Sequence, residues 1–78
     1  MLFAREVQEL LGAYPGRDFR MLHICRYIIG KSPDHKRRKA VREAVRVVLI
    51  ALEESGVLER TPATKNGGYA LYRWKSAR

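Results

Sequence analysis

The chain has 78 residues, 46% of them hydrophobic, which suits one small folded domain and excludes both a disordered chain and a second core. Its 16 basic and 8 acidic side chains give a net charge of +8, which favours an anionic partner such as nucleic acid or acidic lipid. A lone cysteine excludes an internal disulfide, and no apolar run reaches the roughly 20 residues of a membrane span, so we expect one cytoplasmic domain over residues 1–78.

The first helix is predicted from Leu2 to about Ala13, and Pro15-Gly16 ends it. Its apolar residues recur at helical spacing: Phe3, Val7, Leu10, Leu11 and Tyr14. Residues 17–19 then form an extended connector that provides one strand's worth of pairing.

A second helix is predicted over residues 20–29, with Asp18 as its N-cap and Gly30 as the residue after its last turn. Its buried stripe has the spacing i, i+3, i+4, i+7 and consists of Met21, Ile24, Cys25 and Ile28. A different and wetter face of the same helix carries Arg20, His23 and Tyr27.

The third helix is predicted to begin at Ser32-Pro33-Asp34, because Ser suits the N-cap, Pro the first helical position and Asp the positive helix end. It continues to about Ser55, and Gly56 closes it. One side is apolar and consists of Val41, Ala44, Val45, Val48 and Leu52. The opposite side is basic and consists of His35, Arg38, Lys39, Arg42 and Arg46. Such a helix can hold a cationic stripe against a polyanion while its back packs on the domain.

Two strands are predicted at residues 57–60 and 69–74, where branched and aromatic residues replace the helical period. The loop between them, residues 61–68, carries an Asn66-Gly67 turn signal. Lys75 to Arg78 are expected to form a frayed basic tail. The order of helix, short strand, helix, helix and hairpin indicates an α+β fold.

This order, together with one stretch of sequence, resembles the winged helix-turn-helix superfamily. Residues 52–60 (LEESGVLER) resemble the family's join between recognition helix and wing, in which an acidic helix end and a glycine lead into an apolar strand. Residues 68–71 (GYAL) resemble the return strand of the wing. The resemblance implies a winged helix of three helices, a short strand and a C-terminal two-stranded wing hairpin.

The resemblance also implies binding to double-stranded DNA, with the third helix in the major groove and the hairpin loop on a neighbouring minor groove or phosphate. By position, the groove-facing residues are Asp34, His35, Arg38, Lys39 and Arg42. The helix is longer than is usual for the superfamily, and residues 36–39 are four consecutive bases where uncharged residues are common. The second departure favours phosphate attraction over sequence readout.

The basic side of the third helix also has a structural interpretation as a solvated surface, but its charges have one sign and only Glu43 interrupts them. We therefore assign Arg38 and Arg42 to base edges, which arginine contacts bidentately. The remaining predicted DNA-binding residues contact phosphate or complete the stripe: His35, Lys36, Lys39, Arg46, Thr64 and Lys65.

The leading hypothesis is a small transcriptional regulator, associated with the nucleoid in a bacterium or archaeon. A nucleic-acid module of a replication, recombination or mobile-element protein would use the same contacts. A protein-interaction adaptor is the alternative from another class, since an exposed patch of Val47, Leu49 and Ile50 would suit a partner or a second copy. Membrane-surface binding ranks last, because the apolar stripe is needed for the core.

The aromatic residues of the hairpin have two interpretations. Tyr69, Tyr72 and Trp74 could stack on single-stranded bases. Aromatic residues on a hairpin are more often part of a core, and the alternation of Tyr69 and Leu71 favours that position.

A metal or catalytic site is not expected. His23, Cys25 and His35 lack the spacing of a zinc site, and Cys25 lies on the buried stripe, where it is inert packing. The sequence has no glycine-rich phosphate loop, no paired carboxylates and no Ser-His-Asp arrangement. We therefore expect no enzyme activity, cofactor, metal or small-molecule ligand.

Overall fold

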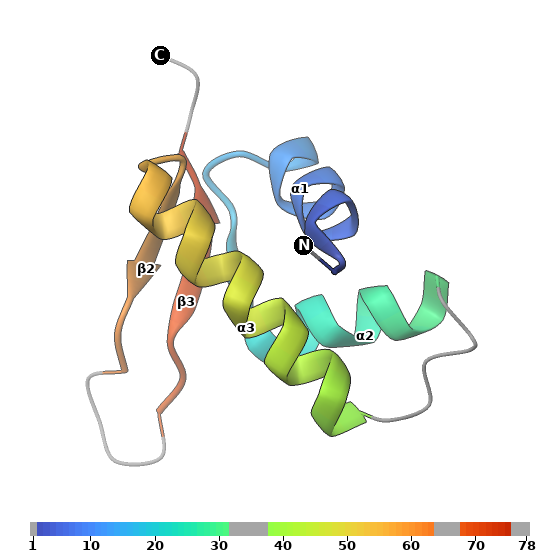
Figure 1. Cartoon of the computed structure of the whole chain (residues 1–78). Helices are drawn as coiled ribbons and strands as arrows, with labels where there is room; N and C mark the ends of the chain where they lie inside the picture. The colour runs from blue at the N-terminus through green and yellow to red at the C-terminus, as the bar shows by residue number, and fades with distance from the viewer. Residues whose placement is uncertain (1, 32–37, 64–67, 76–78) are drawn as a thin grey trace.

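The structure, a computed structural model, describes residues 2–31, 38–63 and 68–75, apart from the side chain of Arg38. These described residues form three helices and a three-stranded sheet (Figure 1). In chain order the elements are α1 (Ala4–Ala13), β1 (Asp18–Arg20), α2 (Met21–Lys31), α3 (Arg38–Ser55), β2 (Leu58–Thr61) and β3 (Leu71–Trp74). Across these described ranges, no helix has both the length and the apolar content that crossing a bilayer requires.

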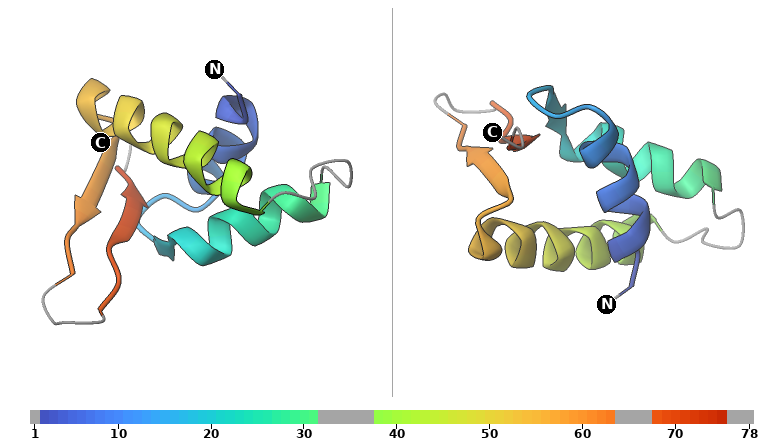
Figure 2. Two further views of the ribbon diagram at one scale, coloured as in Figure 1. Left: turned by 60° about the horizontal axis from the view of Figure 1, so that its bottom comes forward. Right: turned by 90° about the horizontal axis from the view of Figure 1, so that it is seen from above.

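β3 is the central strand of the sheet, because both other strands pair with it. The strand order is β1-β3-β2, and both pairings are antiparallel. Tyr72 of β3 lies opposite Phe19 of β1 on one side and opposite Arg60 of β2 on the other. The sheet stands to one side of the helices, and α3 runs from it across the molecule toward the end of α2 (Figures 1 and 2).

The core forms where the inner faces of the three helices meet the sheet. α3 packs against α1, α2 and β2. Its Val41, Val45 and Val48 are buried, as the sequence predicts, and Ala44 and Leu52 are half-buried against them. The buried cluster consists of Phe3, Val7, Leu11, Phe19, Ile24, Cys25, Ile28, Val41, Val45, Val48, Leu49 and Leu58.

The predicted elements occur in the predicted order, and the α+β arrangement is compatible with a winged helix. The start of α2 lies within one residue of the prediction, but both residues predicted to cap this helix are wrong. Asp18 lies in β1, opposite Arg73, so it is not the N-cap of α2. Gly30 lies inside α2, which continues to Lys31. The Nζ atom of Lys31 lies 3.3 Å from Oε2 of Glu9 in α1, a tertiary contact that favours the two additional helical residues.

Two further expectations are wrong. The sequence places Leu49 in an exposed patch with Val47 and Ile50, but Leu49 is only 1% exposed because the sheet covers that side of α3. Lys75 is expected to fray, yet its backbone N–H donates a hydrogen bond to the carbonyl oxygen of Val57 at 2.9 Å. The rest of the expected tail, residues 76–78, lies outside the described residues.

Gly56 ends α3, as the sequence predicts. Its φ of 88° lies in the left-handed region, where a residue with a Cβ atom is strained. In this turn the N–H of Gly56 donates a hydrogen bond to the carbonyl oxygen of Glu53 at 3.1 Å. The N–H of Val57 donates a second one to the carbonyl oxygen of Leu52 at 3.3 Å. The glycine therefore satisfies the helix end and directs the chain into β2.

We expect Gly56→Ala to lower the free energy of unfolding by about 1–2 kcal/mol, because it puts a Cβ atom at a left-handed position. Gly30→Ala is the matched control, since a Cβ there meets nothing within 4 Å and the backbone is helical. The free energy of unfolding of that variant should rise by about 0.5–1 kcal/mol. Urea unfolding measures both changes, and equal effects would contradict the left-handed helix end.

Candidate nucleic-acid interface

A groove of about 1080 Å³ lies between α2, the first turns of α3 and the chain that leads into β3. These segments meet in the lower part of the molecule as Figure 1 shows it, and Figure 2 (left) turns this part toward the viewer. The groove is lined by side chains from all three segments and by Arg20 at the end of β1. Residues that are distant in sequence therefore share one concave surface.

Five basic side chains line this groove: Arg20, Arg26, Lys39, Arg42 and Arg46. We call them the groove cations. Among the described lining residues, Glu43 is the one acid. The groove thus concentrates in one place much of the positive charge that the composition shows.

The ion pairs of the described chain lie elsewhere. They join side-chain atoms 3.2 to 3.3 Å apart in Lys31 and Glu9, Arg60 and Glu53, and Arg73 and Glu59. Within the part of the chain that the structure describes, none of the groove cations forms an ion pair with a carboxylate. Cations that lack such partners create a positive potential that attracts polyanions.

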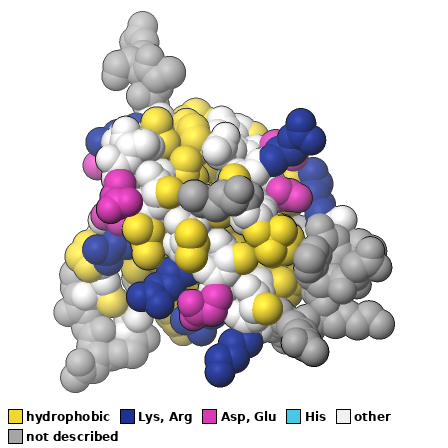
Figure 3. Space-filling view, viewed as in Figure 1, with side chains coloured by type: hydrophobic (Ala, Val, Ile, Leu, Met, Phe, Trp, Pro, Cys, Tyr) yellow, Lys and Arg dark blue, Asp and Glu magenta, His cyan; other side chains and the backbone are white. Residues whose placement is uncertain are grey.

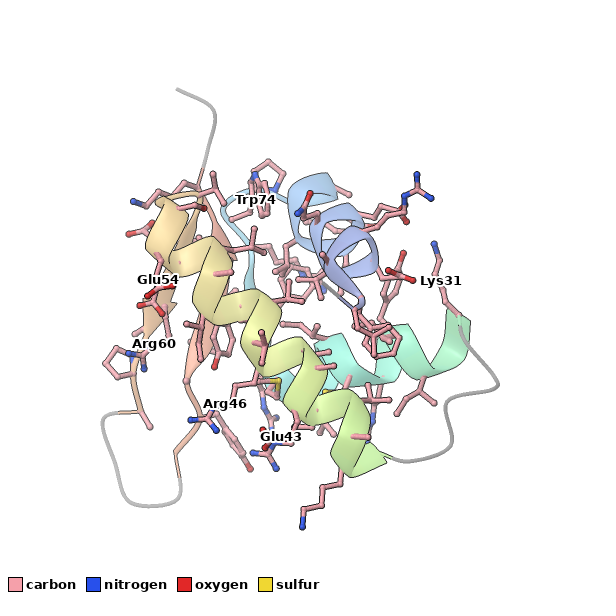
Figure 4. The ribbon with its side chains drawn as sticks, in the orientation of Figure 1. Lys31, Glu43, Arg46, Glu54, Arg60 and Trp74 are labelled. Atoms are coloured by element: carbon pink, nitrogen blue, oxygen red, sulfur yellow. The ribbon has the colours of Figure 1, made fainter. Side chains whose placement is uncertain are left out.

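Helical spacing explains why α3 supplies three of the groove cations. Lys39, Arg42 and Arg46 are exposed, whereas Val41 and Val45 in the same turns are buried. Figure 4 shows Arg46 on the side of α3 that faces the hairpin, with Glu43 one turn nearer to the start of the helix. The predicted opposition of an apolar and a basic side of this helix is therefore confirmed for its described side chains.

Arg20 stacks on Tyr69 at the edge of the groove. The guanidinium carbon of Arg20 lies 3.6 Å from the centroid of the Tyr69 ring, a close cation–π contact. The Nε atom of Arg20 is buried and has no hydrogen-bond partner among the described atoms. The stack therefore joins the start of α2 to the hairpin.

The predicted core position of Tyr69 is wrong, because its side chain is 62% exposed. The reason is that β3 begins only at Leu71, so Tyr69 precedes the paired ladder and strand alternation does not set its direction. Tyr72 and Trp74 lie in the ladder and are half-buried against the core, in agreement with the core interpretation.

The groove also has an apolar floor. It is formed by Met21, Leu22, Cys25, Ile29 and Ala70. Leu22 is among the exposed large hydrophobic side chains, with 44% of its surface open. The site thus combines positive charge with surface that water solvates poorly.

Only some of the predicted DNA-binding residues can be placed. Lys39, Arg42 and Arg46 come together in the groove. Those outside the described residues are His35, Lys36, Thr64 and Lys65, together with the side chain of Arg38.

The sequence interpretation missed Arg20 and Arg26 as site residues, and for Tyr69 it weighed base stacking but preferred a core position. A signal existed for Arg20, since a cation next to the amino end of a helix opposes the helix dipole. The stack on Tyr69 depends on the pairing of β1 with β3, which no local pattern reveals.

No protein-family model, curated protein or solved structure matches this chain. The described residues also contain no group of three or more His, Cys, Asp or Glu side chains arranged to hold a metal ion.

Cys25 lies in the floor of the groove beside the cations. Burial raises the pKa of its thiol, and the positive charge of Arg42 opposes part of that rise. The neutral thiol is thereby favoured, so a smaller fraction of Cys25 is the reactive thiolate at a given pH.

Alkylation of Cys25 by iodoacetamide at pH 8 should therefore be slower in the folded protein than in urea, because the raised pKa leaves less thiolate. Arg42→Ala should slow the folded reaction further, since it removes the charge that lowers the pKa. Mass spectrometry of the alkylated fraction over time measures both rates. Equal rates with and without urea would contradict the raised pKa of the Cys25 thiol.

Proposed function

We propose that this chain is a winged-helix domain that binds double-stranded DNA and serves as a small transcriptional regulator. The observation that carries the proposal is the groove of five cations without carboxylate partners among the described side chains. DNA supplies a dense row of phosphates, which is the complement of such a surface.

The element order and the sheet support the winged-helix part of the proposal. A helix and a short strand, α1 and β1, precede the two consecutive helices α2 and α3. The hairpin of β2 and β3 follows, and its second strand, β3, also pairs with β1. In a winged helix this arrangement places the hairpin beside the recognition helix, as β2 and β3 lie beside α3 in Figure 1. We infer from this placement that α3 enters the major groove and the hairpin contacts the DNA backbone.

The groove cations divide by chemistry. Arg42 has the planar fork that recognises guanine edges, so we assign it to a base. Lys39 is a point charge at the start of α3 and suits a phosphate, and Arg46, one turn beyond Arg42, suits the next phosphate. Arg38 stays a predicted base contact, and Lys36 and Lys65 stay predicted phosphate contacts.

A replication, recombination or mobile-element protein would use the same contacts with DNA. Such a protein would differ from a regulator in the larger assembly to which the domain belongs. We favour regulation because a basic groove on a small domain is sufficient for that role. In either case the domain acts by binding rather than by catalysis.

Affinity for short duplex DNA should fall steeply with salt. If the four groove cations other than Arg42 contact phosphate, the slope of log affinity against log salt is about −3 to −4, since each contact contributes about −0.9. A fluorescence-anisotropy titration at several salt concentrations measures this slope. Binding that does not respond to salt, or no binding, would refute the proposal.

Arg42→Ala should weaken binding to a preferred duplex by about 1–3 kcal/mol if Arg42 contacts a base edge. Arg5→Ala is the matched control, because it removes the same charge from an exposed position on α1 outside the groove lining. Anisotropy titrations of both variants at one salt concentration compare them. An equal loss in the two variants would mean that total charge, and not the groove, determines binding.

A protein-interaction role is the second candidate, and one observation favours it. Val47 and Ile50 are 53% and 46% exposed on the outer side of α3. Figure 3 shows hydrophobic side chains gathered over the middle of this face. With Leu49 buried, the patch is smaller than the sequence predicts.

Light scattering over a range of protein concentrations tests this second candidate. A dimer that forms through the patch should be weakened by Val47→Ser with Ile50→Ser, since both side chains are exposed and the core is untouched. A monomer at every concentration would leave the patch without a role in self-association.

A further inference from the structure

Tyr69 presents an open aromatic face inside the cationic groove. Tyr69 is 62% exposed even though the guanidinium of Arg20 lies 3.6 Å from the centroid of its ring. Because Arg20 covers one face of the ring, the other face is the one that a ligand can reach. Phosphate groups are recognised by charge and hydrogen bonds, so binding of phosphate alone does not explain an open aromatic face.

Arg20 holds this ring in place from behind. Arg20 lies opposite Leu71 in the sheet, and Tyr69 is only two residues before Leu71, so the ladder restrains the backbone next to both partners. The Nε atom of Arg20 is buried and makes no described hydrogen bond, so stacking is the contact that the described structure gives this guanidinium. A ring that is already positioned loses little freedom when a ligand stacks on it.

The floor of the groove extends this apolar character. Leu22, which is 44% exposed, and Ala70 line the same groove as Tyr69. Bases in an intact duplex cover one another's faces, whereas an unpaired base exposes both of its faces to a protein. The volume of about 1080 Å³ is as large as a typical small-molecule site, so a nucleotide fits.

We propose that the open face of Tyr69 is a stacking site for an unpaired nucleobase, with Arg20 behind the ring and Lys39 and Arg46 on the adjoining phosphates. The preferred ligand is then a duplex with a neighbouring single-stranded segment rather than a fully paired duplex. This inference rests on the proposed DNA binding and specifies the form of DNA that the groove takes.

The test compares a blunt duplex with the same duplex carrying a short overhang that contains 2-aminopurine. The wild-type protein should bind the overhang duplex about 5- to 150-fold more tightly, the range expected for stacking one base on an aromatic ring. Stacking should also quench the fluorescence of the 2-aminopurine. Tyr69→Ala should remove both effects, and Tyr69→Phe, which keeps the ring, should retain them.

Tyr14→Ala is the matched control, because Tyr14 is also exposed beside an arginine but lies outside the groove. It should leave both measurements unchanged, and circular dichroism verifies that each variant is folded. Equal wild-type affinity for the two duplexes, or an equal loss on both with Tyr69→Ala, would overturn the stacking site and leave DNA binding intact. Failure to bind either duplex would instead refute DNA binding itself.

Discussion

Burial of the valine face of α3 fixes where the groove cations of that helix lie. Val41, Val45 and Val48 lie in one cluster with Ile24 and Ile28 of α2. Each fully buried side chain of this size contributes about 1.5–3 kcal/mol, far more than an exposed charge can oppose. Once these valines turn inward, the basic residues between them must face outward, so hydrophobic burial and not electrostatics determines where the cations lie.

The clustered charge therefore lowers the stability of the fold through repulsion between like charges, and packing of the core does not need that cluster. Like charges in one groove repel, and Arg20 next to the amino end of α2 also opposes the helix dipole. The ion pairs of the described chain involve Lys31, Arg60 and Arg73, none of which lines the groove. Proteins tolerate such local conflicts chiefly where a ligand resolves them.

Helix positions, the end of α3 and most of the core could be predicted from the sequence, because the valine spacing and Gly56 act locally. Three features could not. Gly30 remains helical within a longer α2, and Leu49 is covered by the sheet. Tyr69 is exposed because the ladder starts only at Leu71. Each depends on contacts between distant segments, so the charged side of α3 was foreseeable and the Arg20 stack was not.

The central place of β3 has a consequence for how the domain matures. β1 and β2 do not pair with each other, so neither has a strand partner until Leu71–Trp74 is in place. A chain that still lacks that segment can form its helices but not the sheet, and Arg20 cannot yet stack on Tyr69. Such long-range pairing is slow compared with helix formation. The side of the groove that Arg20 and Tyr69 form should thus be completed in the last step of folding, when β3 joins the sheet.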